Sequence, residues 1–330
     1  MNKENLRVAY VDAPKTQNIN NNLIINILRN KFNIIFDNNT PDLLIYEPFG
    51  FNHLSYTDPL KLFFTGENVF PDFNVCDYAL SHMRDNVGGR NFHLRHYHST
   101  FRPMNNVTPD MAHRDFCSFV VYDDSSRIGS QLRIKFTQYL SEHYKHVVCP
   151  GRVLHNYDAP EFSARFSSDW NNSKRLLLSR YKFNIAFENT NTDGYITEKI
   201  VDAFYANTIP IYWGSEGNTL PFPKNAMIYA NDYPDFPSLI NRIRELDEND
   251  DLYLEVLRAN PLLDTYFIDN QKKYRQRLEE WLYGVGYQAL SRHLIGGCLE
   301  RRSVTGFTLS YKIRKMAEKL GITDYNKLFE

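Results

Sequence analysis

The sequence predicts an α/β protein made of two consecutive domains with parallel strands, and three observations support this prediction. Short apolar strand patterns recur between polar turns in both halves of the chain. A strand–helix–strand unit stands out at residues 183–215. The length of 330 residues is sufficient for two hydrophobic cores of ordinary size. We therefore expect domains at 1–112 and 113–265 that face a cleft, followed by a helical segment at 266–330.

In the first half, candidate strands and one helix alternate with turn-forming residues. The helix is expected at "NNLIINILRNKF", where Asn20 to Asn22 are available as N-caps. Strand patterns occur at "LRVAYVD", "NIIFD", "DLLIYEPF", "LKLFFTGEN" and "CDYALSH". This spacing of short strands and turns is typical of an α/β domain.

The second half repeats this organisation. A strand is expected at "RDFCSFVVYDD", a helix at about residues 130–144, a strand at "HVVCPG" and a helix near "NNSKRLLLSRY". The alternating residues of "FNIAFEN" then predict a strand, "YITEKIVDAFY" a helix, and "TIPIYWGS" a second strand. Because a connection of this length crosses over the sheet, those two strands are expected to be parallel.

Composition and charge exclude several classes of protein. A net charge of -1 gives no general attraction to nucleic acid. The four cysteines lack metal-binding spacing, so neither a zinc site nor a disulfide framework is expected. No apolar stretch approaches the ~20 residues that span a bilayer, and no signal peptide is recognisable, so we expect a cytoplasmic protein. The basic and apolar C-terminal segment is either a surface helix or a peripheral contact with the inner membrane.

Lys199 lies where a helix is expected to begin, and the helix macrodipole disfavours a cation there. An anion in the crevice above the sheet would explain this placement, and a diphosphate is the usual anion at such sites. An exposed surface lysine is the alternative. Arg133, near the start of another helix and on the border of its buried stripe, would direct a second cation to the same crevice.

Three further residues of this unit are candidates for ligand contact. Glu198 either favours the helix N-terminus or accepts hydrogen bonds from ribose hydroxyls. Asn189 and Tyr195 flank the polar loop, with an Asx-turn and a packing ring as their alternatives. The sequence contains neither glycine-rich phosphate loop and no DxD pair. We therefore expect a nucleotide held by side-chain cations without an essential metal.

The stretch "FNIAFENTNTDGYITEKIVDAFYANTIPIYWGS" resembles the donor-binding motif of the α-1,3-fucosyltransferases of glycosyltransferase family 10. That motif has a phenylalanine-rich strand, Phe-Glu-Asn, a loop, Tyr-x-Thr-Glu-Lys, and a strand ending in Trp-Gly. "FFTGEN" resembles the first-domain motif of the family, and "FCSFVV" with its arginine-bearing helix resembles the start of the second domain. The resemblance covers roughly residues 60 to 260.

This resemblance implies a GT-B fold with two Rossmann-like domains, of which the second binds GDP-β-L-fucose and the first helps to bind the acceptor. The donor-site residues that match the motif are Arg133, Asn189, Tyr195, Glu198 and Lys199. The two cations would neutralise the diphosphate, and Glu198 would bind the ribose. Glu67, in "TGEN", matches the catalytic base; without the family, a loop glutamate that caps nearby N–H groups is the alternative.

The second diphosphate cation has two candidates. Many family members have Ser-Asn where this chain has Tyr122-Asp123, and the spacing from that strand to the arginine is longer here. Arg127 is therefore an alternative to Arg133.

The resemblance implies an inverting bacterial enzyme that moves L-fucose to N-acetyllactosamine- or lactose-type acceptors, in Lewis x-type glycan synthesis on lipopolysaccharide. Golgi members of the family carry an N-terminal anchor; we expect none here, which favours a bacterial enzyme. No metal is expected to be essential, although manganese could stimulate transfer through weak contacts with the diphosphate. The alternatives are another GT-B nucleotide-sugar transferase and a non-catalytic carbohydrate-binding protein. The acceptor, the choice of α-1,3 or α-1,4 linkage and the oligomeric state stay open.

Overall fold

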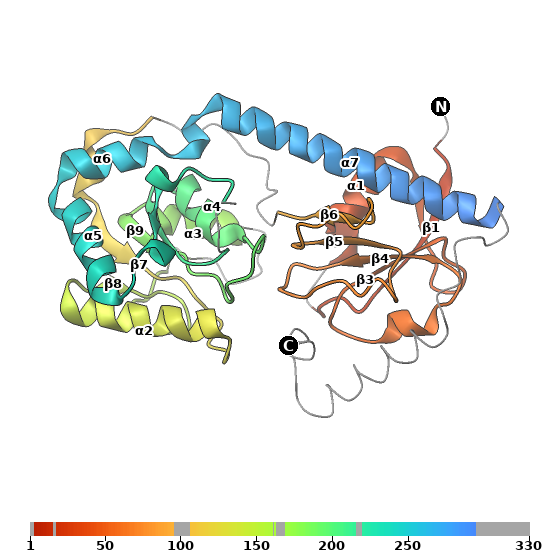
Figure 1. Cartoon of the computed structure of the whole chain (residues 1–330), viewed down its shortest axis with the longest axis horizontal. Helices are drawn as coiled ribbons and strands as arrows, with labels where there is room; N and C mark the ends of the chain where they lie inside the picture. The colour runs from red at the N-terminus through yellow and green to blue at the C-terminus, as the bar shows by residue number, and fades with distance from the viewer. Residues whose placement is uncertain are drawn as a thin grey trace. The chain divides into compact units, whose positions relative to one another are not determined.

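The computed structural model describes residues 3–15, 18–95, 106–160, 162, 169–215 and 220–294 (Figure 1). The chain divides into two compact units, one of Met1–Leu94 with Lys273–Glu330 and one of Arg95–Lys272. These limits differ from the expected boundaries at residues 112 and 265. A short 3-10 helix, η3 (Pro109–His113), contacts β9 and α6 of the second unit, and the last helix supplies core residues to the first.

The first unit contains a six-stranded sheet in the order β2-β1-β3-β4-β5-β6, and every neighbouring pair of strands is parallel. The strands are β1 (Asn5–Val11), β2 (Asn33–Phe36), β3 (Leu43–Tyr46), β4 (Leu60–Phe64), β5 (Tyr78–Ser81) and β6 (Asn91–His93). Helix α1 (Leu23–Lys31) connects β1 to β2. The Asn22 side chain accepts a hydrogen bond from the backbone N–H of Ile24, so one of the expected N-caps is confirmed.

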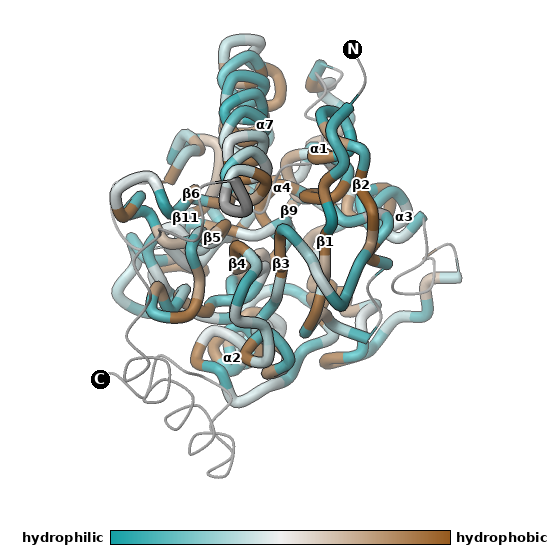
Figure 2. Tube along the Cα trace, turned by 90° about the vertical axis from the view of Figure 1, so that its right-hand side faces the viewer, coloured by the Kyte–Doolittle hydropathy of each residue, from teal (hydrophilic) through white to brown (hydrophobic). Residues whose placement is uncertain are grey.

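Strand alternation gives this sheet two different faces. Leu6, Val8 and Tyr10 of β1 pack beneath α1 and helix α7 (Thr265–Leu294), which cover one face (Figure 1). Tyr46 and Phe63 point to the other face, where they pack with Leu54 of the short 3-10 helix η2 (Asn52–Ser55) and with residues of loops. The strands are largely apolar in Figure 2, whereas α7 carries many polar residues. Within the described residues, this sheet thus has two helices on one side and a thinner layer of loops with one 3-10 helix on the other.

A buried polar cluster fixes the carboxyl end of β1. The Asp12 carboxylate accepts hydrogen bonds from the backbone N–H groups of Asn52 (2.9 Å) and His53 (3.0 Å), and lies 2.6 Å from His53 Nδ1. Burial raises the pKa of Asp12, but these hydrogen bonds outweigh it and hold the pKa below its usual value. Nearby, Tyr10 donates a hydrogen bond of 2.6 Å to the buried Glu47. The loop after β3 is therefore tied to the end of β1.

The second unit contains a five-stranded parallel sheet in the order β11-β10-β9-β7-β8. Its strands are β7 (Asp115–Ser118), β8 (Val147–Val148), β9 (Tyr181–Ile185), β10 (Ile209–Tyr212) and β11 (Ile228–Tyr229). Its helices are α2 (Ile128–His143), α3 (Trp170–Leu178), α4 (Glu198–Tyr205), α5 (Phe236–Glu248) and α6 (Asp250–Arg258). The predicted strand–helix–strand unit is β9, α4 and β10, and its two strands are parallel as expected.

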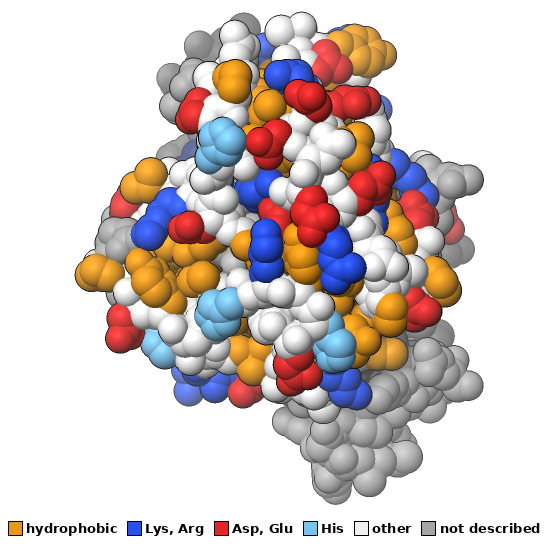
Figure 3. All heavy atoms as spheres, turned by 90° about the vertical axis from the view of Figure 1, so that its left-hand side faces the viewer, with side chains coloured by type: hydrophobic (Ala, Val, Ile, Leu, Met, Phe, Trp, Pro, Cys, Tyr) orange, Lys and Arg blue, Asp and Glu red, His pale blue; other side chains and the backbone are white. Residues whose placement is uncertain are grey.

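Two hydrophobic clusters enclose this second sheet. Phe183, Ile185 and Ile211 pack with residues of α2, α5 and α6, whereas Ala186 and Tyr212 point to the opposite face with α4. Acidic and basic side chains are interspersed over the described part of the outer surface seen in Figure 3. Among the described residues, no helix combines the length and apolar character required to cross a membrane. The segment expected to contact a membrane lies mostly outside the described residues.

Both sheets are doubly wound, as the predicted α/β class requires. Read in chain order, each sheet places its first strand between its second and third strands. The direction of winding therefore reverses between β1 and β3 in one unit, and between β7 and β9 in the other. Ligands of open α/β sheets bind outside the carboxyl ends of the strands at such a reversal.

Two glycines of α7 provide a test of how this helix packs on the first sheet. A Cβ atom at Gly286 would lie 2.6 and 2.8 Å from ring atoms of Phe32, which is buried, whereas nothing lies within 4 Å of a Cβ atom at Gly284. We expect Gly286→Ala to lower the free energy of unfolding by about 1–3 kcal/mol through overpacking. Gly284→Ala should raise it by up to about 1 kcal/mol, because alanine is the better helix former. Urea denaturation measures both changes, and equal effects would exclude this packing.

Candidate active site

The candidate site lies where β7 and β9 end, at the point where the winding of the second sheet reverses. The backbone N–H of Gly129, in the first turn of α2, donates a hydrogen bond of 2.9 Å to the carbonyl of Asn189. A Cβ atom at Gly129 would collide with the carbonyl oxygens of Glu188 and Asn189. Glycine therefore lets the N-terminus of α2 touch the loop that follows β9.

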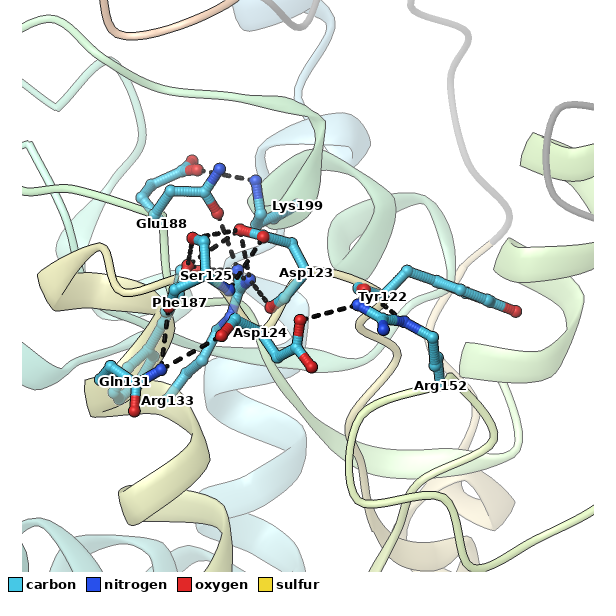
Figure 4. A network of polar contacts seen from close by, with 12 residues as sticks. Tyr122, Asp123, Asp124, Ser125, Gln131, Arg133, Arg152, Phe187, Glu188 and Lys199 are labelled. Atoms are coloured by element: carbon cyan, nitrogen blue, oxygen red, sulfur yellow. Dashed lines mark hydrogen bonds and ion pairs between the residues drawn. The ribbon is translucent and has the colours of Figure 1, made fainter. Parts of the chain in front are cut away.

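Arg133 extends from α2 into this contact (Figure 4). Its Nη1 donates to Asn189 Oδ1 (2.9 Å) and to the carbonyl of Phe187 (3.4 Å), and its Nη2 donates to the carbonyl of Asp123 (2.7 Å) and to Ser130 Oγ (3.3 Å). The residue is only 1% exposed. The expected position on the border of the buried stripe is therefore wrong: Arg133 is a core residue that joins α2 to the ends of both strands.

Arg133 also determines how Asn189 lies. Because Asn189 Oδ1 accepts from the guanidinium, the amide NH₂ group of this half-buried residue is turned away from Arg133. Arg127 is exposed and stands at the N-cap of α2. The structure thus brings Arg133 and Asn189 into direct contact. Which arginine contacts a diphosphate stays a prediction.

A buried carboxylate, Glu188, organises the start of α4. Its Oε1 accepts hydrogen bonds from the backbone N–H (2.8 Å) and hydroxyl (3.0 Å) of the N-cap residue Thr197, and its Oε2 lies 2.7 Å from that hydroxyl. Lys199 Nζ donates to Glu188 Oε2 over 3.1 Å and to Thr197 Oγ1 over 2.9 Å. Gly214 is necessary beside it, because a Cβ atom there would lie 2.7 Å from Glu188 Cγ.

Lys199 is the second residue of α4, at the start of the helix as expected, and its charge already has a partner. Burial lowers the pKa of its ammonium group, but the Glu188 and Glu198 carboxylates outweigh this effect and raise the pKa overall. Lys199 is therefore cationic at neutral pH. Two of the three Nζ hydrogen-bond donors are used within the described residues, and 19% of the side chain is exposed. One donor can still bind an external anion.

Sequence reasoning missed Glu188, although a signal was present. In "FNIAFEN", Glu188 falls on the same strand face as Asn184 and Ala186, and that face becomes buried against α4. A charged residue at a buried strand position requires a partner, and Lys199 is the nearest cation in the chain that follows. The anion that compensates Lys199 is therefore part of the protein.

The remaining predicted residues lie in different surroundings. Glu198 is exposed at the first position of α4, where a carboxylate can accept hydrogen bonds from a ligand. Tyr195 is 2% exposed, so its ring packs beneath the site. Glu67 belongs to the first unit, in the turn after β4, where its backbone N–H donates to Thr65 Oγ1 over 2.9 Å. Within the described ranges, no group of His, Cys, Asp and Glu side chains could hold a metal ion.

Two family descriptions match the chain. Residues 8–101 match the alpha-(1,3)-fucosyltransferase FucT N-terminal domain, and residues 118–277 match the C-terminal part of glycosyltransferase family 10 (fucosyltransferase). Two α/β units, each with a parallel, doubly wound sheet, define a fold of the GT-B class. The chain belongs to the fucosyltransferases of glycosyltransferase family 10.

Curated relatives and solved structures agree with this assignment. The alpha-(1,3)-fucosyltransferase FucT of Helicobacter pylori is 30% identical over 293 residues, which are 76% of this chain and 59% of that protein. The GDP-fucose protein O-fucosyltransferase 3 of Xenopus tropicalis is 33% identical over 36% of this chain and 26% of its own length. Crystal structures of an alpha1,3-fucosyltransferase with GDP and with GDP-fucose have TM-scores of 0.65 and 0.64, each at 25% identity. They cover 85% and 86% of this chain, and each match includes 91% of the solved chain.

Substitutions at Glu188 and Glu198 distinguish a buried structural carboxylate from an exposed one. Glu188→Gln should lower the free energy of unfolding by about 3–5 kcal/mol, because it removes the buried partner of Lys199. Glu198→Gln, at an exposed helix start, should change it by at most about 1 kcal/mol. Denaturant unfolding at neutral pH measures both. Similar small effects would show that Glu188 does not hold the start of α4.

The pH dependence supplies a control for this comparison. The pKa of Lys199 is raised in the folded chain. The charge of Lys199 therefore contributes fully to stability below the pKa of an unfolded lysine, about 10.4. This contribution is lost only as the pH rises through the pKa of the folded state. The difference between wild type and Glu188→Gln should therefore be equal at about pH 7 and pH 9, well below that value.

Proposed function

We propose that this chain transfers L-fucose from GDP-fucose to a hydroxyl group of a glycan acceptor. The observation that carries the proposal is the junction of α2 and α4 at residues 187–189. There, the remaining Lys199 donor and the amide of Asn189 are available to one ligand, and the exposed Glu198 stands at the first position of α4 beside them. A diphosphate and a ribose match these groups chemically. The crystal structures of a related enzyme with GDP and GDP-fucose support the choice of nucleotide.

The proposed reaction is an inverting displacement. The acceptor oxygen attacks the anomeric carbon of fucose, the bond from that carbon to the diphosphate oxygen breaks, and GDP departs with the bonding electrons. Negative charge therefore grows on the diphosphate, where Lys199 and the start of α4 stabilise it more strongly than in the ground state. Arg133 holds Asn189 and adds positive charge to the same region. The resemblance at "TGEN" supports Glu67 as the base that takes the acceptor proton.

The acceptor is proposed to be an N-acetyllactosamine- or lactose-type glycan that receives fucose through an α-1,3 linkage. The product would belong to Lewis x-type lipopolysaccharide synthesis. The enzyme is proposed to be cytoplasmic or peripheral on the inner membrane. Similarity to the Helicobacter pylori alpha-(1,3)-fucosyltransferase supports the linkage. The chain spans 59% of that relative, and the partial match to a protein O-fucosyltransferase makes a polypeptide acceptor the second candidate. No essential metal is proposed, with manganese as a stimulant at most.

One set of incubations tests this proposal. Purified protein is mixed with GDP-fucose and with lactose, N-acetyllactosamine, its type-1 isomer or an unfolded polypeptide acceptor, with EDTA or with manganese. We expect a fucosylated N-acetyllactosamine whose linkage analysis shows α-1,3 and the inverted anomer, also in EDTA. Transfer to the polypeptide alone would show that the acceptor is a polypeptide and not a glycan. Absence of transfer and of GDP binding would support a carbohydrate-binding protein.

Lys199→Ala should weaken GDP-fucose binding about 10- to 100-fold, because it removes a charge-assisted hydrogen bond of about 1.5–3 kcal/mol to the diphosphate. It also leaves Glu188 without its cation, so the variant should be less stable. The double variant Glu188→Gln/Lys199→Ala should recover stability but not affinity. Titration calorimetry and thermal unfolding measure the two properties. Normal affinity in the double variant would show that Lys199 serves only as the partner of Glu188.

Glu67→Gln should lower turnover by about 10²–10⁴, the usual contribution of a general base, while GDP-fucose affinity and melting temperature stay close to wild type. Glutamine keeps the size of the side chain but cannot accept the acceptor proton. Glu47→Gln is the matched comparison, since Glu47 is buried and accepts a hydrogen bond from Tyr10 in the same unit. If Glu67→Gln lowers turnover less than about tenfold and Glu47→Gln lowers it more, Glu47 and not Glu67 is the base.

A further inference from the structure

An exposed ion pair lies next to the candidate site, at the carboxyl ends of two neighbouring strands. Asp124 follows β7 and Arg152 follows β8, and Arg152 Nη2 lies 2.8 Å from Asp124 Oδ1. Both side chains are 60% exposed. Exposed ion pairs contribute little to stability, so folding alone does not account for the way this one is held.

Further hydrogen bonds hold both residues of the pair. Arg152 donates from Nε (3.0 Å) and Nη2 (2.6 Å) to the carbonyl of Tyr122, so its planar group is clamped in one orientation. Gln131 of α2 donates to the carbonyl of Asp124 over 3.2 Å. Within the part of the chain that the structure describes, no hydrogen bond is made by Arg152 Nη1 or Asp124 Oδ2. A donor and an acceptor are therefore presented side by side to solvent.

The pair is physically connected to the proposed diphosphate site. Asp123, next to Asp124, accepts from Arg133 through its carbonyl, and Gln131 stands two positions before Arg133 on α2 (Figure 4). Both Asp124 and Arg152 lie at the sheet edge where nucleotides bind in doubly wound folds. The Tyr122 ring also contacts Trp170, the first residue of α3, at 5.5 Å. Aromatic side chains thus lie near the pair, and bases stack on such rings.

We propose that Asp124 and Arg152 read the guanine base of the donor nucleotide. Guanine presents the acceptor O6 beside two donors, N1–H and the N2 amine. Arg152 Nη1 can donate to O6, as arginine does in its commonest base contact, while the Asp124 carboxylate accepts from N1–H and N2. Uracil offers the same acceptor and donor in O4 and N3–H, but its second acceptor, O2, takes the place of the N2 amine and would face the Asp124 carboxylate unfavourably. This inference rests on the proposed function and assigns its nucleotide specificity to these two residues.

The test compares nucleotides that differ only at the base. Calorimetric affinities are measured for GDP, for inosine diphosphate, which lacks the N2 amine, and for UDP, with wild type, Asp124→Ala, Arg152→Ala and the matched control Glu245→Ala. Glu245 is an exposed carboxylate of the same unit, 2.5 Å from Arg242. Wild type should prefer GDP to inosine diphosphate about 10-fold or more, as expected for a hydrogen bond to a charged group. Asp124→Ala should abolish that preference and narrow the difference in affinity between GDP and UDP.

The other variants and outcomes decide the proposal. Arg152→Ala should weaken GDP and inosine diphosphate to the same extent, since both nucleotides carry O6, and Glu245→Ala should match wild type. A preserved GDP preference in Asp124→Ala would overturn the guanine assignment and leave fucosyl transfer intact, with the pair acting as a clamp between two loops. A wild type that binds no GDP and transfers no fucose would overturn both the assignment and the proposed function.

Discussion

A single buried carboxylate, Glu188, fixes the geometry on which the candidate donor site depends. A charge removed from water is costly unless it is paired and hydrogen-bonded. Here the N-cap residue Thr197 and the ammonium of Lys199 supply the partners. The position of α4 along its axis, the identity of its N-cap and the place of Lys199 all follow from this arrangement. Any shift of β9 against α4 would leave a buried charge without partners.

The other helix of the site, α2, is held by a buried cation, Arg133. Arg133 is buried, and carbonyl and side-chain oxygens from both strand ends surround its guanidinium. Burial raises the pKa of the Asp123 carboxyl, but hydrogen bonds from Ser125 and Ser130 and the nearby Arg133 outweigh it, so this carboxylate remains charged at neutral pH. Glu188 thus holds α4 and Arg133 holds α2. Lys199 and Asn189 face solvent in part, and each can still donate a further hydrogen bond.

The first unit uses the same physical device at its own reversal point. Asp12 and His53 tie the loop after β3 to the end of β1, just as Arg133 ties the end of β9 to that of β7. Among the described residues, loops and the short 3-10 helix η2 pack on one face of this sheet, so their position depends on such buried polar contacts. A rigid carboxyl edge in each unit is consistent with a reaction whose substrates must be held in a fixed geometry.

The sequence by itself determined the class of fold, because period-two strands alternating with a period-3.6 helix leave a parallel α/β arrangement as the only economical one. It also indicated the cations, since lysine at a helix start requires an anion. It did not reveal β6 and β11, which have three and two residues and are too short to show a period. Only the tertiary structure decided that Glu188 is the anion beside Lys199 and that Arg133 is buried. Both facts depend on which strand face packs against which helix, and residues distant in the chain decide that packing.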